Sequence, residues 1–421
     1  MNPTFKRIAR SALRRVGLAP IGSVVPASAG IWDGYTRDAM GLAQWVDCDR
    51  ASLERPQQHP ERLAPRVADR RCNWYLPVFD SPYYGGVMTI LRLAAQLKSR
   101  DGVAQRFLIC GACDTASLGA KIGEAFAPLA GSEVMALDSA AALESIPAAD
   151  YSVATLWTTA YVLLGVRNAA LKFYMIQDYE PLFYPAGSTY AQAELTYRFG
   201  FHGIANTIGV RDIFEREYGG RAVVLTPSID TTVFRPGEPP PATGPRRLFY
   251  YARPGTPRNG FELAAAAFRI VKRRMGDGVE IVCAGASWSL ADYRLEGVVT
   301  TQGMLPYAET GALYRSCHVG LAMMMTKHPS YLPFELMACG TLVVSNRNTA
   351  NDWFLKHGEN CLLSQPTASC LAETLVEALE GYERYEPVRR RAADLIAREH
   401  GDWSAALERV IRFMHDPETL S

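Results

Sequence analysis

The stretch that decides the fold is Tyr331-Leu-Pro-Phe-Glu-Leu-Met-Ala-Cys-Gly340, which is followed at once by Thr341-Leu-Val-Val-Ser345. Its pattern predicts a turn, a short helix with Pro333 at its first position, a glycine stop and a buried strand. A helix that begins there offers free N–H groups and the positive end of its dipole, and Glu335 lies one turn inside. Such an arrangement suits a phosphate together with a hydroxyl. An ordinary amphipathic helix packed on a sheet would show the same pattern.

Length and composition limit the class of protein. The chain has 421 residues and 48% hydrophobic content, enough for two or three domains with large cores. Its net charge of +1 gives no overall positive field, so we expect no nucleic-acid partner. The nine cysteines follow no metal or disulfide spacing, and the one CxxC, Cys110 to Cys113, favours buried cysteines at a strand end over a redox pair. We therefore predict no metal site and a reducing compartment.

Short apolar runs alternate with helical patterns along most of the chain, which predicts the α/β class with parallel sheets. A proline-rich linker, residues 237–245, separates two Rossmann-like domains, 71–236 and 246–399. We expect these domains to face each other across a cleft and to bind ligands where the carboxyl ends of their strands meet. The predicted strands are 106–110, 152–156, 172–176, 203–206 and 222–225 in the first domain, and 248–252, 280–284, 319–323 and 342–345 in the second.

The lead-in, residues 1–70, opens with a basic amphipathic pattern. Such a helix lies on an anionic membrane surface or docks on the protein itself, and the pattern leaves both open. The chain has no apolar run long enough to span a bilayer and no apolar core of a secretory signal, so we expect a cytoplasmic protein, with peripheral contact at the inner face of the cell membrane as the open option. The apolar face is Phe5, Ile8, Ala9, Ala12, Leu13 and Val16, and the basic face is Lys6, Arg7, Arg10 and Arg14.

Two further segments have residue types that suit phosphate. Tyr83-Tyr-Gly-Gly86 precedes a helical pattern, and its glycines would let the backbone approach an anion at the helix start, although glycine pairs also form plain turns. Arg253-Pro-Gly-Thr-Pro-Arg258 follows a predicted strand, and an arginine can bind phosphate through two N–H groups. Judged without comparison to any family, both arginines would be ordinary surface residues.

A third segment, Gln177-Asp178-Tyr-Glu180, follows a predicted strand and is surrounded by aromatic residues. A carboxylate there would orient an acceptor hydroxyl, accept its proton or hold a sugar ring, and Asp178 is the preferred candidate over Glu180. The alternative is an Asp-capped turn into the next helix.

In this order the segments resemble family-4 glycosyltransferases of GT-B fold, over most of residues 72–415. They are specifically similar to a bacterial subgroup that includes rhamnosyltransferases of surface-glycan assembly, through Tyr83 to Gly86, Gln177 to Pro185, and His328 to Tyr331. One position departs from the family. Lys327 stands where the family has a glutamate that contacts the transferred sugar, so this chain holds its sugar differently or holds a different sugar.

The resemblance implies a retaining, metal-independent transfer of a sugar, with L-rhamnose from deoxythymidine diphosphate the first expectation, to a growing bacterial glycan that a lipid could carry. It implies no cofactor, and it implies that the last helix, within 400–421, returns to the first domain. It assigns catalytic roles to Asp178, Arg253 and Arg258. The implied donor-binding residues are Gly85, Gly86, Arg253, Arg258, Gly303, Met304, Lys327, Ser330, Tyr331, Leu332 and Glu335, and the implied acceptor-binding residues are Tyr84, Gln177, Asp178 and Glu180.

Two alternatives stay open at this point. A nucleotide-sugar epimerase of the same fold would turn over a donor without any acceptor. A catalytically silent binder of glycans or nucleotide sugars would hold the donor and never release the nucleoside diphosphate, and Lys327 makes this reading conceivable.

Overall fold

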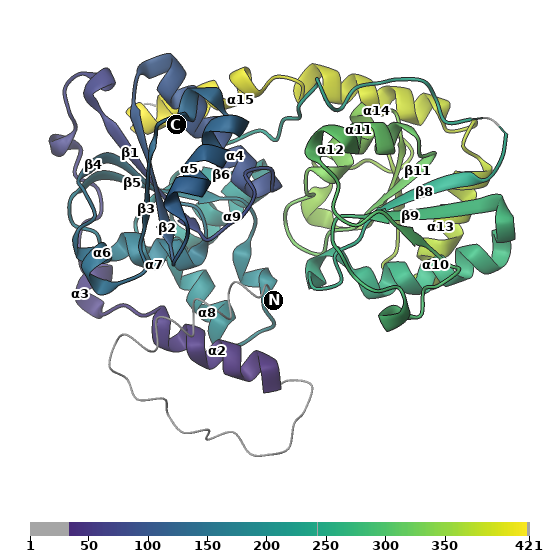
Figure 1. The fold of residues 1–421 in the computed structure, drawn as a ribbon, viewed down its shortest axis with the longest axis horizontal. Coiled ribbons are helices and arrows are strands. Elements are labelled where there is room, and N and C mark those ends of the chain that lie inside the picture. The colour runs from purple at the N-terminus through teal and green to yellow at the C-terminus, as the bar shows by residue number, and fades with distance from the viewer. Residues whose placement is uncertain (1–32, 242, 419–421) are drawn as a thin grey trace. The chain divides into compact units, whose positions relative to one another are not determined.

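The computed structural model describes residues 33–241 and 243–418, so the basic segment at residues 5–16 lies outside the described residues. The chain divides into two compact units (Figure 1). Unit 1 comprises Met1–Leu225 and Leu407–Ser421, and unit 2 comprises Thr226–Ala406. Unit 1 is therefore built from two separate stretches of sequence, and unit 2 is inserted between them.

Unit 1 contains a seven-stranded parallel sheet in the order β3-β2-β1-β4-β5-β6-β7. Most of its strand residues are buried and apolar, as parallel strands covered on both faces require, and every residue of β5 is buried, including Lys172. The strands are β1 (Arg71–Pro77), β2 (Ala104–Cys110), β3 (Glu133–Ala136), β4 (Ala149–Ala154), β5 (Ala169–Ile176), β6 (His202–Ala205) and β7 (Ala222–Val224). The helices are α2 (Asp33–Trp45), α3 (Arg50–Glu54), α4 (Gly85–Asp101), α5 (Thr115–Ala125), α6 (Ala140–Glu144), α7 (Trp157–Gly165), α8 (Ser188–Leu195) and α9 (Ile208–Tyr218).

The end of the chain completes unit 1. The last helix, α15 (Trp403–His415), places Phe413 edge-on to Phe173 of β5, with ring centroids 6.2 Å apart. His415 bonds through Nδ1 to the Tyr151 hydroxyl at 2.8 Å and through Nε2 to a carboxylate oxygen of Asp101 at 2.9 Å. On the opposite face of the sheet, α2, α7, α8 and α9 form one apolar cluster with the strands.

Unit 2 contains a six-stranded parallel sheet in the order β10-β9-β8-β11-β12-β13. Figure 1 shows α10 and α13 on one face of this sheet and α11, α12 and α14 on the other, and each group has its own buried apolar cluster. The strands are β8 (Arg246–Tyr251), β9 (Val279–Ala284), β10 (Thr300–Thr301), β11 (Val319–Ala322), β12 (Leu342–Asn346) and β13 (Leu362–Ser364). The helices are α10 (Phe261–Met275), α11 (Tyr307–Arg315), α12 (Leu332–Ala338), α13 (Ala368–Glu380) and α14 (Glu386–Glu399).

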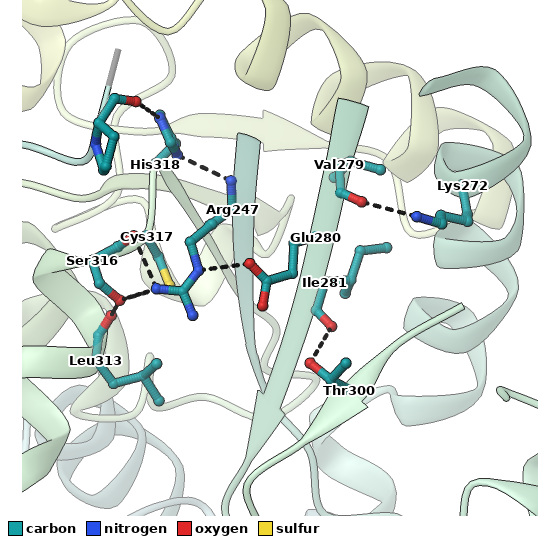
Figure 2. A network of polar contacts seen from close by, with 11 residues as sticks. Arg247, Lys272, Val279, Glu280, Ile281, Thr300, Leu313, Ser316, Cys317 and His318 are labelled. Carbon is teal, nitrogen blue, oxygen red and sulfur yellow. Dashed lines mark hydrogen bonds and ion pairs between the residues drawn. The ribbon is translucent and has the colours of Figure 1, made fainter. Parts of the chain in front are cut away.

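A polar network ties the amino ends of three neighbouring strands of unit 2 together (Figure 2). Arg247 of β8 bonds through Nε to Glu280 of β9 at 3.0 Å and through Nη1 to the Ser316 hydroxyl at 2.6 Å. His318, just before β11, accepts the Arg247 backbone N–H at Nδ1 and places Nε2 3.3 Å from the Pro241 carbonyl oxygen. These contacts fix the end of the sheet that lies opposite the carboxyl ends of the strands.

All nine cysteines have free thiols. Cys110 ends β2, and burial raises the pKa of its thiol to about 12. Burial also raises the pKa of Cys113. Both thiols therefore resist forming the thiolate that redox chemistry needs.

Candidate functional site

In the sheet of unit 2, the neighbouring strands β8 and β11 are followed by loops that run to opposite sides. After β8 the chain builds β9 and β10 on one side, then returns to build β11, β12 and β13 on the other. The loops that follow β8 and β11 therefore leave the sheet in opposite directions, which is where open α/β sheets bind their ligands. Arg253 and Arg258 lie on the first of these loops, and Lys327 and Ser330 lie on the second.

The start of α12 lies at this same edge, because α12 connects the carboxyl end of β11 to the amino end of β12. The helix has seven residues, with Pro333 in its first turn, and within the described chain no side-chain hydrogen bond from Tyr331 caps its first N–H groups. Ser330 directly before it has the left-handed backbone φ of 67°. The first turn thus presents uncapped donors to the edge of the sheet.

Aromatic packing on the buried face of α12 holds the helix in place. The Phe334 ring is fully buried and stacks on Phe354 with centroids 4.0 Å apart and planes 8° apart. The His400 ring lies edge-on to Phe334 at 4.8 Å. Leu332 packs against the same apolar cluster, and the Tyr331 ring lies 6.1 Å from that of Trp403.

Arg253 and Arg258 lie on the loop after β8, and a backbone hydrogen bond joins this loop to the one after β11. The Arg253 guanidinium carbon lies 5.9 Å from the centroid of the Tyr251 ring. The Arg258 carbonyl oxygen accepts the Met325 N–H at 2.8 Å, and this bond joins the loop after β8 to the loop after β11. Arg258 and Lys327 therefore belong to the same part of the edge.

Two asparagines hold the loop after β11, and the sequence analysis missed them. Asn346 exchanges hydrogen bonds with both backbone groups of Met324, at 2.9 and 3.0 Å. Asn348 donates to the carbonyl oxygens of Met324 and Thr326 at 3.1 and 2.6 Å. Both asparagines follow the predicted strand 342–345, so their position after a strand was the signal that could have identified them.

Gly303 and Met304 follow β10, the outermost strand on the other side of β8. Gly303 has a φ of 62°, and its carbonyl oxygen accepts the Gly285 N–H at 2.8 Å. Met304 exposes 56% of its surface. The hydrogen bond between Gly303 and Gly285 joins the loops that follow β9 and β10.

Glu335 is half-buried in the first turn of α12. Burial raises the pKa of its carboxyl from 4.5 to about 7, and a hydrogen bond with Tyr314 opposes the rise. At neutral pH the carboxyl is therefore divided between its protonated and ionised forms.

This shift predicts a pH dependence of stability. Between pH 4.5 and 7 the folded protein holds a proton that the unfolded chain has lost, so the free energy of unfolding should fall by about 1–3 kcal/mol as the pH rises through this window. Glu335→Gln should remove that part of the fall. Urea unfolding of both ligand-free proteins at pH 5 and pH 7.5 measures the difference, and equal losses in the two proteins would contradict the raised pKa.

Unit 1 has an equivalent divergence between β1 and β4, because β2 and β3 lie on one side and β4 to β7 on the other. Helix α4 begins at Gly85 after β1, and Tyr84 gives it no side-chain cap within the described chain. Gly86 lies against the side chain of Gln177, which follows β5: a Cβ at Gly86 would meet the Gln177 amide oxygen at 2.9 Å. The structure thus brings these predicted site residues together.

The two acids of unit 1 have different surroundings. Asp178 exposes 6% of its surface, and its carboxylate accepts the Tyr179 N–H at 2.7 Å. Glu180 exposes 1%, and its carboxylate accepts the Trp157 N–H at 2.6 Å and the Tyr174 hydroxyl at 2.7 Å. Glu180 therefore holds the start of α7 inside the unit, and its contact with a sugar stays a prediction.

The predicted site residues thus form two groups, each described within its own unit. Neither unit contains, among the described residues, a group of three or more His, Cys, Asp or Glu side chains that could hold a metal ion. No helix in the described ranges has the length and apolar character needed to cross a bilayer.

Comparisons with known proteins give a family and a fold. Residues 71–207 match the family model for the N-terminal domain of WsaF, and residues 246–376 match that for its C-terminal domain. The chain is 42% identical over 376 residues to the O-antigen biosynthesis protein RfbC of Myxococcus xanthus, covering 88% of this chain and 29% of that protein. The chain therefore spans less than a third of the length of this relative.

Solved structures with little sequence identity share the fold. Sucrose-phosphate synthase from Thermosynechococcus elongatus has a TM-score of 0.62 at 14% identity, over 84% of this chain and 100% of that chain. HepE from Anabaena, in complex with UDP and glucose, has a TM-score of 0.64 at 15% identity, over 82% of this chain and 99% of that chain. These similarities confirm the predicted α/β class and the GT-B fold.

Proposed function

Because the chain carries both WsaF domains, we propose that it is a glycosyltransferase of bacterial glycan biosynthesis. The similarity to an O-antigen biosynthesis protein supports a growing surface glycan as the acceptor. The structural likeness to HepE, which was solved with UDP and with UDP-glucose, supports a nucleotide sugar as the donor.

The observation that carries the proposal is that cationic side chains, helix N–H groups and a carboxyl group come from elements that meet at the carboxyl edge of the unit 2 sheet. Arg258 and Lys327 supply positive charge there, on loops joined by a backbone hydrogen bond. The uncapped first turn of α12 supplies N–H donors, and Glu335 supplies an acceptor one turn inside. Cations and N–H donors suit a diphosphate, and a carboxylate suits the two hydroxyls of a sugar ring.

The transfer step that we propose is the one that the family resemblance implies. The bond between the anomeric carbon and the phosphate oxygen breaks, the acceptor oxygen bonds to that carbon, and the acceptor proton passes to an oxygen of the departing diphosphate. Arg253, Arg258 and the start of α12 stabilise the negative charge that develops on the diphosphate. Same-face attack of this kind retains the anomeric configuration. It needs no metal ion or cofactor, and Asp178 then positions the acceptor rather than acting as a nucleophile.

Our first choice of donor is deoxythymidine diphosphate L-rhamnose, which rests on the resemblance to rhamnosyltransferases. Lys327, in place of the family glutamate, would contact the phosphate or the sugar. The basic segment before residue 33 would bring the enzyme to an anionic membrane surface and so to an acceptor carried on a lipid.

The first experiment is a thermal-shift screen of the purified protein with thymidine, uridine and guanosine diphosphates and their sugars. A ligand that binds only the folded state raises the melting temperature, so one nucleotide series should stabilise the protein by several degrees. We expect the deoxythymidine series to do so. Absence of any response would contradict the donor site.

A turnover assay then separates the enzyme classes. With the stabilising donor, release of nucleoside diphosphate that depends on added glycan acceptor supports a transferase. A changed sugar without any acceptor would identify an epimerase instead. Binding without release under either condition would identify a silent binder.

A further inference from the structure

His328, at the carboxyl edge of unit 2, has a buried ring nitrogen, Nε2, without a hydrogen-bond partner among the described residues. The His328 side chain exposes 4% of its surface. Its Nδ1 accepts the Ser330 N–H at 2.9 Å, so the ring proton is on Nε2. No acceptor among the described residues lies within hydrogen-bond distance of Nε2. A buried N–H without a partner costs free energy, so it calls for an explanation.

The location of the ring suggests what the partner is. His328 lies between the end of β11 and the start of α12, next to Lys327 and two residues before Ser330. The Arg258 charge and, above all, burial lower the pKa of the ring to about 3, so the ring is neutral at physiological pH. It is a fixed donor beside a cationic loop.

A second buried histidine of unit 2 shows the contrast. His318, 1% exposed, has a partner at both ring nitrogens, at the amino ends of the strands (Figure 2). Burial lowers its pKa too. Burial of a histidine in this unit therefore does not by itself leave a ring nitrogen without a partner.

The groups around His328 mostly donate hydrogen bonds. Arg258 and Lys327 carry only N–H donors, and the first turn of α12 adds backbone N–H groups. A ligand that meets several donors at once must offer several acceptors, and phosphate oxygens accept without donating. A sugar hydroxyl would need an acceptor as well.

We propose that Nε2–H of His328 donates a hydrogen bond to a phosphate oxygen of the donor diphosphate, beside Arg258. The inference rests on the proposed function and adds a residue to its donor site. His328 also holds the N–H of Ser330, whose left-handed backbone leads into α12, so one side chain both shapes the loop and contacts the ligand.

Two substitutions separate these tasks. In His328→Asn the amide oxygen can still accept the Ser330 N–H, but no donor remains at the position of Nε2. In His328→Gln the amide nitrogen reaches the position of Nε2 and restores the donor. His318→Asn is the matched control, because it changes a histidine of similar burial at the other end of the sheet.

The experiment is calorimetric titration of the full chain with deoxythymidine diphosphate, with uridine diphosphate and with thymidine, which lacks phosphate. His328→Asn should weaken binding of the diphosphate about 10- to 100-fold, as loss of a hydrogen bond to a charged group predicts, and leave thymidine binding unchanged. His328→Gln should recover most of the affinity. His318→Asn should bind the diphosphate like the wild type.

The outcomes distinguish this inference from the proposed function. If the wild type binds a nucleoside diphosphate and His328→Asn binds it equally well, the role of His328 is refuted and the donor site stands. If the wild type binds neither diphosphate, both proposals fall. If His328→Gln, which loses the acceptor for the Ser330 N–H, lowers both the melting temperature and the affinity while His328→Asn keeps both, the ring has only a structural role and the inference is refuted.

Discussion

Arg258→Ala should lower kcat for sugar transfer by about 100- to 1000-fold and change KM much less. The guanidinium is expected to contact charge that grows as the diphosphate leaves, so its loss affects the transition state more than the bound donor. The measurement is release of nucleoside diphosphate at saturating donor and acceptor. Arg258→Lys should retain part of the rate, because it keeps the charge but loses the paired N–H geometry.

Arg273→Ala is the matched control for this variant. Arg273 is an exposed arginine of α10, in the same unit, and its removal should leave kcat and KM unchanged. Full activity of Arg258→Ala would show that the loop after β8 takes no part in the reaction. An equal loss in both arginine variants would point to a general effect of charge.

Phe334→Ala should destabilise unit 2 by about 3–5 kcal/mol. The ring is fully buried, stacked on Phe354 and flanked by His400, so its removal leaves a cavity that rigid neighbours cannot fill. The measurement is urea unfolding followed by a probe that reports on unit 2, because a protein of two units can unfold in two steps. Nucleotide affinity should fall as well, since the ring supports the start of α12.

Two further variants test whether the loss of stability depends on the apolar volume removed at Phe334. Phe334→Leu keeps much of the apolar volume and should cost clearly less than the alanine variant. Arg273→Ala, at an exposed position, should change the free energy of unfolding by less than about 0.5 kcal/mol. An unfolding midpoint of Phe334→Ala equal to that of the wild type would contradict the stacked arrangement.

The sequence predicted most strands, because apolar runs bounded by turns report burial on both faces of a parallel sheet. Each of the nine predicted strands overlaps an observed one. The interior strand β1 was missed, since Arg71, Asn73 and Pro77 interrupt its apolar pattern, and the short strands β3, β10 and β13 were missed as well. Asn73 is buried only because it accepts from Arg106 at 3.0 Å and donates to the Pro147 carbonyl at 2.9 Å. Contacts between such distant residues are invisible in a local pattern.

For the candidate site too, the sequence predicted some features and left others to the fold. Arginines and acids after predicted strands could be recognised in the sequence, because chain order alone places them at one edge of a parallel sheet, and Gly85 and Gly86 were recognised from the helical pattern that follows them. The side chains that surround these residues could not be predicted from the sequence. Burial of Glu180 against Trp157 and the support of Met324 by Asn346 depend on side-chain packing between strands. The sequence indicates which residues reach the edge, and the fold decides which of them remain available to a ligand.

The return of residues 407–415 to unit 1 has a consequence for synthesis on the ribosome. The strands of unit 1 emerge first, but Phe413 and His415, which cover Phe173 and bond to Tyr151, emerge only after all of unit 2. We expect the apolar surface around Phe173 of nascent unit 1 to stay exposed to solvent while unit 2 is synthesised and folds. Chaperone binding to stalled nascent chains should therefore persist until α15 has left the exit tunnel.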